Sequence, residues 1–338
     1  MTDRDSERAL VTLLADGRPH GLQQTCERLA SSWANIDALI GSLARKGLQI
    51  ERQGRETIRL PWPIQLLDED RIREALAEEV DASLWGLEVL WCTDSTNSRL
   101  MARAAPGGAF ACFAEFQTAG RGRQARPWRA PLGGGLCMSV SYALPEQSRD
   151  LAAIGLVAGV AVRNALKKCG AADLQLKWPN DLMWQKRKVG GLLSELRSDA
   201  RNDAGNKAQK FHRLVVGVGI NYRLDAAART EISRLGGLAP ADIEEVCGGK
   251  LPDRNVLAAQ IAGELLQSFK IFTEAGFEPF ASAWRAVDAC KDAPVVVTMQ
   301  SRKLDGVARG IDASGALQLD VGGKITRIVS AEVSMRPA

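Results

Sequence analysis

Four arginines lie within one short, glycine-containing stretch of the sequence. Residues 116–129, which we call the arginine loop, contain Arg121, Arg123, Arg126 and Arg129. Apolar residues alternate or run together at 110–116 and again at 136–142, which predicts two strands joined by a long exposed connection. Like charges this close repel one another until an anion arrives. We therefore expect a loop that is mobile when empty and orders around a phosphate or carboxylate. A solvated arginine-rich loop or an RNA-binding segment would have the same composition.

A second polar group stands where a strand should give way to a helix. After the apolar residues 87–91 come four short hydrogen-bonding side chains in a row, Asp94, Ser95, Thr96 and Asn97. One of them is enough to cap a helix, which is the ordinary role of such residues. The others could satisfy the polar edge of a small ligand, such as a urea-like or amide head group.

Two basic stretches follow further along the chain. Lys177-Trp178-Pro179-Asn180-Asp181 carries a turn signature between two apolar segments, and Lys186-Arg187-Lys188 precedes Val189-Gly190-Gly191. On local grounds the first is a hairpin turn with an exposed lysine, and the second is a charged hairpin tip. The alternative for both is a cationic site that meets an anionic ligand.

The sequence excludes several kinds of site. The whole chain has two histidines, which leaves few candidates for a histidine-rich metal site or a Ser-His-Asp arrangement. No metal site is therefore predicted. Any catalysis should then depend on Lys, Arg, Asp and backbone amides. Gly217-Val218-Gly219 lacks the third glycine of a dinucleotide fingerprint and no Walker-type sequence occurs, so a nucleotide would bind without a P-loop.

Composition also limits the surroundings in which the chain works. The seven cysteines are scattered with no C-x-x-C pair, which favours a reducing cytoplasm. A formal net charge of +4 is too small to indicate nucleic-acid binding by itself. The longest apolar run, at 151–162, is too short to cross a bilayer, so we expect no membrane contact.

The first 64 residues have the pattern of a winged helix-turn-helix. Apolar spacing predicts a helix ending at Asp16-Gly17, then helices and extended pieces over residues 22–29, 33–46, 48–52 and 57–60. Pro61-Trp62-Pro63 would form a stiff linker. The function of this segment has two alternatives, DNA binding and a helical docking module. Residues 1–62 carry nine Lys/Arg against eight Asp/Glu, which is a weak electrostatic footprint for a DNA binder, so the sequence does not decide between them.

In the remainder, strands follow strands with few helices between them, which predicts an α+β sheet rather than strict βαβ alternation. Helices are expected over residues 68–80, 151–168, 253–273 and 277–287. The polar residues 198–210 are expected to form a flexible surface loop. Four short strands with glycine turns between residues 295 and 329 predict a small SH3-like β-barrel.

The order of these motifs resembles the biotin–protein ligase family, and the N-terminal segment is similar to that of its bifunctional ligase and biotin operon repressor type. The resemblance implies a multidomain α+β chain: a winged helix-turn-helix (1–64), a class II synthetase-like catalytic domain with a mixed sheet (65–287) and an SH3-like barrel (288–338). It implies that biotin and ATP, with Mg²⁺, give biotinyl-5'-AMP. A lysine of the biotin carboxyl carrier protein of a biotin-dependent carboxylase would then receive the biotin.

The resemblance also implies roles for single residues of this sequence. Ser95, Thr96, Asn97 and Gln117 would hold the biotin head group, and Arg121, Gly122 and Arg123 would close over carboxylate and phosphate. Lys188 would be the cation that bridges the carboxylate and the α-phosphate. Asp181 would orient that charge network or Mg²⁺, and Trp128 and Asn221 would contact the adenylate. Lys188, Arg123 and Asp181 are the catalytic candidates.

Two alternatives remain beside this hypothesis. Lipoate or octanoate ligases have similar catalytic domains, and a regulator could sense biotin without ligating it. The third helix, at 34–43, has less cationic character than in repressor-type members. Operator DNA is therefore expected as a partner only if the chain is of the full bifunctional type. A ligand-dependent homodimer is a further expectation from that type.

Overall fold

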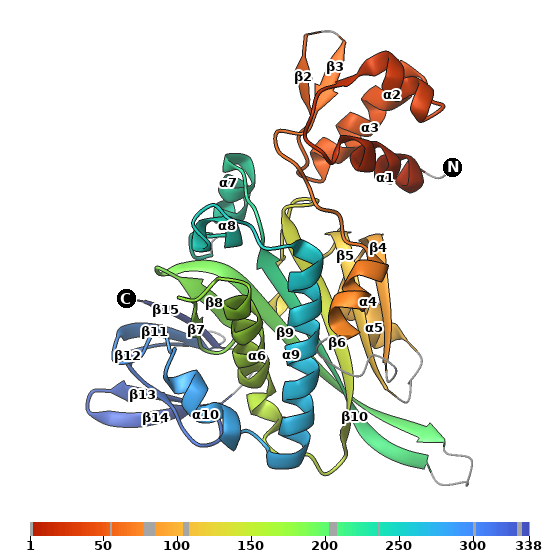
Figure 1. Ribbon diagram of the computed structural model, residues 1–338. Coiled ribbons are helices and arrows are strands. Elements are labelled where there is room, and N and C mark those ends of the chain that lie inside the picture. Colours follow the sequence, from red (N-terminus) through yellow and green to blue (C-terminus); the bar gives the residue numbers. More distant parts are fainter. Residues whose placement is uncertain are drawn as a thin grey trace.

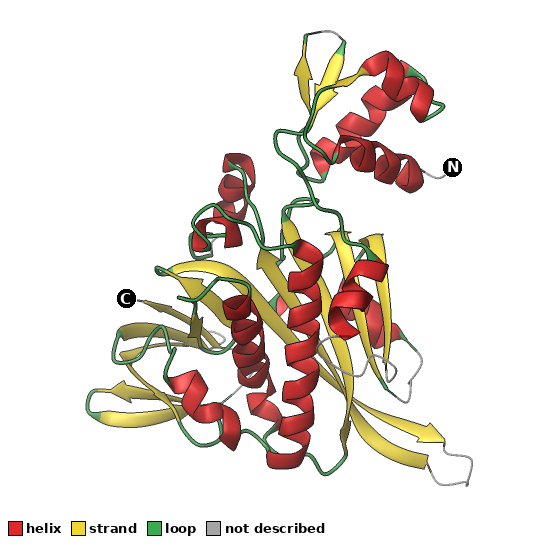
Figure 2. Ribbon diagram, viewed as in Figure 1, coloured by secondary structure: helices red, strands yellow, loops and turns green. Residues whose placement is uncertain are grey.

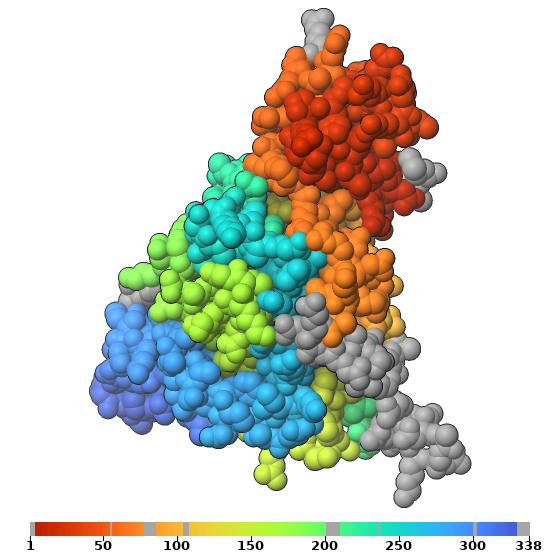
Figure 3. Space-filling view, viewed as in Figure 1, coloured from red at the N-terminus to blue at the C-terminus, as the bar shows by residue number. Residues whose placement is uncertain are grey.

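Three separate sheets organise the chain, as a computed structural model shows (Figure 1). The structure describes residues 3–54, 56–77, 85–103, 108–202, 208–235, 237–299, 302–329 and 333–337. The N-terminal residues form a lobe above the rest of the molecule in the space-filling view (Figure 3). Among the described residues, no helix combines the length and the apolar character needed to cross a membrane.

The N-terminal lobe contains three helices and a three-stranded antiparallel sheet. Its helices are α1 (Asp3–Leu14), α2 (Leu22–Arg28) and α3 (Trp33–Arg45). Its strands, in the order β1-β3-β2, are β1 (His20–Gly21), β2 (Glu51–Gln53) and β3 (Thr57–Arg59). The hydroxyl of Ser32 caps α3 by accepting from the backbone N–H of Asn35 at 3.3 Å. The expected helices and both extended pieces are present, and β1 is an additional strand.

The central sheet is mixed and has seven strands. Its strands lie in the order β4-β5-β6-β10-β9-β8-β7, in which only β4 and β5 pair in parallel among the described pairs. They are β4 (Trp85–Thr93), β5 (Ala109–Gln117), β6 (Gly135–Pro145), β7 (Gln175–Lys177), β8 (Asp181–Trp184), β9 (Arg187–Asn202) and β10 (Ala208–Asn221). Strands that follow one another directly give the α+β organisation predicted from the sequence.

Alternation along the strands places helices on both faces of this sheet. Ala111 and Phe113 of β5 belong to the large core under α4 (Glu69–Ala77), α6 (Ile154–Lys168) and α9 (Arg254–Ala275) (Figure 2). Phe110 and Cys112, which point to the other face, pack with Leu100 of α5 (Thr96–Ala102). The helix α5 therefore begins at the sheet face opposite α6 and α9, directly after the end of β4.

The expected flexible loop at residues 198–210 is wrong in its described part. Residues up to 202 continue β9 and residues from 208 continue β10, paired as Ser198 with His212 and Ala200 with Lys210. Residues 203–207 lie outside the described residues. The polar composition was misleading because this end of the hairpin extends beyond the packed sheet and needs no apolar face (Figure 1). Backbone pairing and the ion pairs of Asp199 with Arg197 and Arg213 stabilise the two strands there.

A five-stranded antiparallel sheet follows the helices α7 (Ala226–Arg234), α8 (Ile243–Val246), α9 and α10 (Glu278–Arg285). In the order β14-β13-β12-β11-β15 it comprises β11 (Pro294–Met299), β12 (Arg302–Ile311), β13 (Leu317–Val321), β14 (Lys324–Ile328) and β15 (Val333–Pro337). Its apolar residues join the core of the central sheet. The indole N–H of Trp178 donates to the carbonyl of Gly315 at 3.1 Å, so this sheet rests directly on the turn between β7 and β8.

The N-terminal lobe shares its core with both ends of the arginine loop. Leu10, Leu14 and Ile36 are fully buried in a cluster that also contains Leu132, and Phe116 packs against it. Phe116 enters the loop and Leu132 follows it shortly after the last arginine. The ends of the loop are therefore anchored to two bodies of structure, the central sheet and the N-terminal lobe.

Candidate active site

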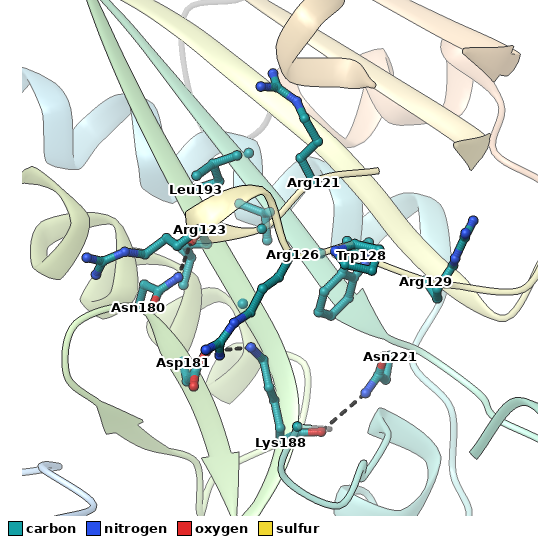
Figure 4. A pocket seen from close by; sticks show the side chains of 18 of the residues that line it. Arg121, Arg123, Arg126, Trp128, Arg129, Asn180, Asp181, Lys188, Leu193 and Asn221 are labelled. Atoms are coloured by element: carbon teal, nitrogen blue, oxygen red, sulfur yellow. Dashed lines mark hydrogen bonds and ion pairs between the residues drawn. The ribbon is translucent and has the colours of Figure 1, made fainter. Parts of the chain in front are cut away.

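A cleft of about 350 Å³ lies beside the arginine loop and collects most of the residues singled out in the sequence (Figure 4). Its lining includes ten of the predicted positions: Ser95, Thr96, Asn97, Gln117, Arg121, Gly122, Arg123, Trp128, Asp181 and Lys188. Asn221 lines it as well. All the predicted site residues thus converge on one cavity, although they come from positions 126 residues apart in the sequence.

The arginine loop folds back on itself as a small hairpin. Arg121 and Pro127 form an antiparallel bridge, and the N–H of Gly122 donates to the carbonyl of Arg126 at 2.7 Å. The N–H of Trp128 donates to the carbonyl of Gly120 at 2.8 Å. A Cβ at Gly120 would lie 2.7 Å from the Trp128 carbonyl oxygen, so this close approach requires glycine.

The loop directs its arginines toward different ends of the cleft (Figure 4). The Arg121 side chain points away from Lys188 and reaches the Ser98 hydroxyl at 3.1 Å and the Glu195 carboxylate at 3.4 Å. Arg126 points toward Asp181 and Lys188. Burial lowers the pKa of the Arg123 guanidinium, and the charge of Asp181 opposes that shift. Arg121 therefore serves one end of the cleft, and Arg123 is electrostatically coupled to the other.

Uncharged hydrogen-bonding groups form the first end of the cleft. Ser95 caps α5, and the backbone N–H of Thr96 donates to Gln117 Oε1 at 2.8 Å. The Ser139 hydroxyl donates to Asn97 Oδ1 at 2.6 Å. A Cβ at Gly217 would lie 2.2 Å from the same Asn97 oxygen, so glycine makes room for this amide. Among the side chains predicted to hold a polar head group, Ser95, Thr96 and Asn97 are buried, and Thr96 contacts both Gln117 and Ser139.

A carboxylate between two lysines forms the second end. The Lys188 ammonium donates to Asp181 Oδ1 at 2.5 Å, and the Lys177 ammonium lies 3.1 Å from Asp181 Oδ2. Burial alone would raise the pKa of Asp181, but the charges of Lys188 and Lys177 outweigh it and lower the pKa below its ordinary value. Asp181 is therefore ionised at neutral pH and holds both ammonium groups at the cleft.

Strand register explains why these three residues meet. Lys177 and Asp181 are directly paired across the turn between β7 and β8. The hairpin of β8 and β9 then places Lys188 beside Met183, with an irregularity at Leu182/Met183 that shifts the register. The hairpin turn and the charged hairpin tip expected from the sequence are both confirmed, and the tip itself falls at Gln185 and Lys186, whose φ angles are 47° and 61°. The expectation that the lysine of the turn is exposed was wrong, because Lys177 is buried against the Asp181 carboxylate.

The backbone of Lys188 is fixed on both sides. Its N–H donates to the Ala239 carbonyl at 2.8 Å, and its carbonyl accepts from the Ala241 N–H at 2.9 Å and from Asn221 Nδ2 at 3.2 Å. The nearby residues Ile232, Leu235, Gly237, Leu238 and Pro240 line the cleft. Sequence reasoning missed this wall of the cleft, because its residues carry no charge or hydrogen-bonding side chain that would single them out.

Two buried polar atoms in the cleft lining have no hydrogen-bond partner within the described chain. They are Oδ1 of Asn221 and the indole N–H of Trp128, which has the Cys137 sulfur, a weak acceptor, beside it. The Trp128 ring packs directly over Gly219, where a Cβ would lie 2.4 Å from Cε2. Buried donors and acceptors in native proteins are nearly always paired, so a donor and an acceptor left open here indicate a ligand with complementary groups.

Sequence reasoning also missed Ser139 and Glu195. Ser139 is fully buried in β6 and bonds to both Thr96 and Asn97, while Glu195 of β9 accepts from Asn97. A serine inside the apolar run 136–142 was the available signal for the first. Glu195 had no signal, because nothing in the sequence shows that β9 passes behind α5.

Comparison with known proteins identifies the class of protein that has this fold and cleft. The Biotin/lipoate A/B protein ligase family model matches residues 89–221, and the model of the Biotin protein ligase C terminal domain matches residues 293–336. A solved structure of the biotin protein ligase from Aquifex aeolicus in complex with biotin and ATP superposes with a TM-score of 0.62 at 28% identity. The superposition covers 75% of this chain and 99% of the Aquifex aeolicus chain.

Full-length relatives narrow the class further. The bifunctional ligase/repressor BirA of Salmonella typhimurium is 35% identical over the whole of both chains, and that of Escherichia coli is 33% identical over 100% of this chain and 99% of its own. The biotin–[acetyl-CoA-carboxylase] ligase of Mycobacterium tuberculosis is 33% identical over 79% of this chain and 97% of its own. The chain belongs to the biotin protein ligase family, which confirms the resemblance found in its motifs.

Proposed function

We propose that this chain activates biotin with ATP to biotinyl-5'-AMP and transfers the biotin to a lysine of a biotin carboxyl carrier protein. The observation that carries the proposal is the two-ended cleft: an uncharged hydrogen-bonding pocket at Thr96 and Asn97, and a cationic cluster at Lys188. A ligand with a neutral polar head and an anionic tail matches both ends at once. Biotin has that arrangement, with a cyclic urea at one end and a carboxylate at the other.

At the first end, Ser95, Thr96, Asn97 and Gln117 would bind the cyclic urea. A urea carbonyl accepts and its two N–H groups donate, so the pocket must offer both kinds of partner. Hydroxyls and carboxamides can do so without carrying charge. The Arg121 guanidinium at this end pairs with the Glu195 carboxylate, which also favours a urea over a carboxylate head.

At the second end, Lys188 and Arg123 would offset the negative charge that accumulates as the biotin carboxylate attacks the α-phosphate. The carboxylate oxygen forms a bond to phosphorus as the bond to the pyrophosphate oxygen breaks. Two anions meet in this step, and oriented cations stabilise its transition state more than water does. Asp181 would act by holding the Lys188 and Lys177 ammonium groups in place.

The middle of the cleft would hold the adenylate. The open indole N–H of Trp128 and the open Oδ1 of Asn221 support this assignment, because adenine and ribose offer both acceptors and donors. Gly122 would complete the closure of the arginine loop over the mixed anhydride, and Arg121 would join it only by turning from Ser98 and Glu195 toward Lys188. Exclusion of water there limits hydrolysis of the activated acyl group.

The cleft does not supply a protein-built Mg²⁺ site. Both oxygens of Asp181 are already paired with ammonium groups, and no cluster of three His, Cys, Asp or Glu side chains occurs in the part of the chain that the structure describes. Mg²⁺ is commonly bound through substrate phosphates and a few waters. Mg²⁺ would therefore enter as part of the MgATP substrate.

In the second step, the carrier lysine would attack the acyl carbon of the adenylate. The new amide bond forms as the bond to the phosphate oxygen breaks, and AMP leaves. The name of the Mycobacterium tuberculosis relative, a ligase for acetyl-CoA carboxylase, supports a carrier protein of a biotin-dependent carboxylase as the partner. We assign the catalytic domain to residues 65–287 and an SH3-like barrel to residues 288–338.

A second function, transcriptional repression, is supported by the N-terminal lobe and by the ligase/repressor relatives. Three helices and the β2–β3 hairpin have the order of a winged helix-turn-helix, which we assign to residues 1–64. Trp33 is 39% exposed at the start of α3, with the Arg52 guanidinium 4.9 Å from its ring centroid. Operator binding would involve a ligand-dependent homodimer.

A salt-dependent mobility shift with the chain's own upstream DNA tests this repressor function, and no shift at low salt would refute it.

The ligase function is tested by ATP-dependent transfer of labelled biotin to a carrier domain, with lipoate as competitor. We expect transfer that requires ATP and is insensitive to a tenfold excess of lipoate. Preferential transfer of lipoate or octanoate would instead support the related ligase activity. Biotin binding without any transfer would support a sensor that does not ligate.

A further inference from the structure

Glu195 lies behind the head-group end of the cleft and has no part in the mechanism proposed above. It belongs to β9, does not line the cleft, and its side chain is 26% exposed. Its Oε2 accepts from Asn97 Nδ2 at 2.7 Å, and the Arg121 guanidinium lies 3.4 Å from the same oxygen. A carboxylate next to a pocket of hydroxyls and carboxamides requires an explanation.

The contacts of Asn97 fix the orientation of its carboxamide. The second N–H of its amide donates to the Leu193 carbonyl at 3.1 Å. A carboxylate and a backbone carbonyl can only accept, so the nitrogen must face Glu195 and Leu193. Oδ1 must then face Ser139, whose hydroxyl donates to it at 2.6 Å. Asn97 is only 3% exposed, so its amide depends on these protein partners.

The orientation of the Asn97 amide also sets which way the Ser139 and Thr96 hydroxyls donate their protons. Ser139 has one hydroxyl proton, and Asn97 Oδ1 can receive it but cannot return one. The Ser139 and Thr96 oxygens are 2.7 Å apart, so the proton in that contact must come from Thr96. The competing acceptor for Thr96, Gln117 Oε1, is more distant at 3.3 Å. The lone pairs of the Thr96 hydroxyl are then left as an acceptor in the cleft lining.

We propose that Glu195 is a positioning residue that fixes the hydrogen-bond direction of the Asn97–Ser139–Thr96 chain. By accepting the shorter of the two Asn97 N–H bonds, beside the one to Leu193, it makes the Thr96 hydroxyl an acceptor for a urea N–H. The identity of the ligand as a cyclic urea rests on the proposed function. The direction of the chain rests only on the contacts of Glu195, Asn97 and Ser139.

The test measures biotin binding by calorimetry on the full chain, together with the KM values for biotin and ATP in the transfer assay. We expect Glu195→Ala to raise the Kd and KM for biotin about tenfold, the loss of one charge-assisted hydrogen bond. The KM for ATP should stay within about twofold, since the other end of the cleft is unchanged. Glu195→Gln keeps an acceptor oxygen for Asn97 and should raise the Kd by less than about threefold.

A double-mutant cycle separates this role from a general structural one. Ser139→Ala breaks the same chain at its next link, so Glu195→Ala and Ser139→Ala together should cost little more than either alone. Glu88→Ala is the matched control, because Glu88 pairs with Arg99 on the outer side of the same helix. It should leave the biotin Kd within about twofold.

Each result has a definite reading. Additive losses in the cycle, an equal rise in the KM for ATP, or a Glu195→Gln variant as weak as Glu195→Ala would overturn the proposal; the last would mean that the charge beside Arg121 matters instead. A parent chain that binds biotin but transfers none would refute the proposed ligase function. The Kd differences would still support the role of Glu195 in that case.

Discussion

Lys188 Nζ lies 2.5 Å from Asp181 Oδ1, and the other oxygen of that carboxylate faces Lys177. A single buried carboxylate thus holds two ammonium groups at one end of the cleft, about where a carboxylate and a phosphate would have to meet. A pair of lysines without Asp181 would repel each other and move apart. The arrangement is therefore built to present concentrated positive charge to an anionic ligand.

Lys188→Ala should slow adenylate formation by about 10²–10³, because it removes a cation from the transition state. Biotin should still bind through the uncharged end of the cleft. Biotin-dependent exchange of pyrophosphate into ATP measures the first property, and calorimetry measures the second. Lys186→Ala, at the exposed tip of the same hairpin, is the matched control. Equal exchange rates in the Lys188 and Lys186 variants would contradict the assignment.

Arg123→Gly should instead loosen retention of the adenylate. The arginine loop would still form its hairpin, but one of the groups that close it over the mixed anhydride would be gone. We expect release of biotinyl-adenylate to accelerate about tenfold or more, the equivalent of one charge-assisted contact. Rapid filtration of the preformed complex measures this rate. Arg149→Gly, at an exposed position that does not line the cleft, is the control. An Arg123→Gly variant that holds the adenylate as long as this control does would refute the role.

Gly219→Ala should weaken nucleotide use without affecting biotin binding. The added methyl group would lie 2.4 Å from the Trp128 ring, so the indole must move. We expect the KM for ATP to rise about tenfold, and the Kd for biotin to stay within about twofold. A rise in the biotin Kd of the same size would show that Trp128 does not act at the nucleotide.

Glu115→Ala should destabilise the whole protein by about 3–5 kcal/mol, because it leaves the buried Arg254 without its counter-ion. Arg254 is 0% exposed and donates to Glu115 at 2.7 Å and to the Gly135 carbonyl at 2.6 Å. Urea unfolding measures the change. Glu69→Ala, which breaks the exposed pair with Arg73, should cost less than about 1 kcal/mol.

Asp312 should contribute to stability in a defined pH window. Burial alone would raise its pKa, but hydrogen bonds from Arg327, Ser314 and the Ala316 N–H outweigh it and lower the pKa to about 2. A folded-state pKa below the ordinary 3.8 gives stabilisation that is complete above pH 3.8 and is lost as pH falls toward 2. The free energies of unfolding of the parent and Asp312→Asn should therefore differ at pH 6 and converge near pH 2. A constant difference across that range would contradict the assignment.

The sequence was sufficient for most of the elements that carry the site. Helical spacing located α3 and α6, and the motif order placed Thr96, Lys188 and Asn221 in one cleft. The error at residues 198–210 arose because polarity was taken for irregular structure. Strands of a hairpin that extends beyond the sheet can be polar on both faces when backbone pairing holds them.

Other features of the site could be found only from the folded structure. Glu195 reaches Asn97 because β9 passes behind α5, and their separation of 98 positions in the sequence hides that contact. The wall formed by Ile232, Leu235 and Leu238 depends on the backbone bridge between Lys188 and Pro240. Such contacts follow from sheet order and register, and local patterns do not encode these.

The most direct test of the central claim is a crystal structure of the chain with a non-hydrolysable biotinyl-adenylate analogue. We predict that Lys188 Nζ will lie within hydrogen-bond distance, about 3 Å, of an oxygen on the acyl–phosphate linkage. The Arg123 guanidinium should face the same group. A bound analogue with Lys188, Arg121 and Arg123 all directed away from its acyl phosphate would contradict the account.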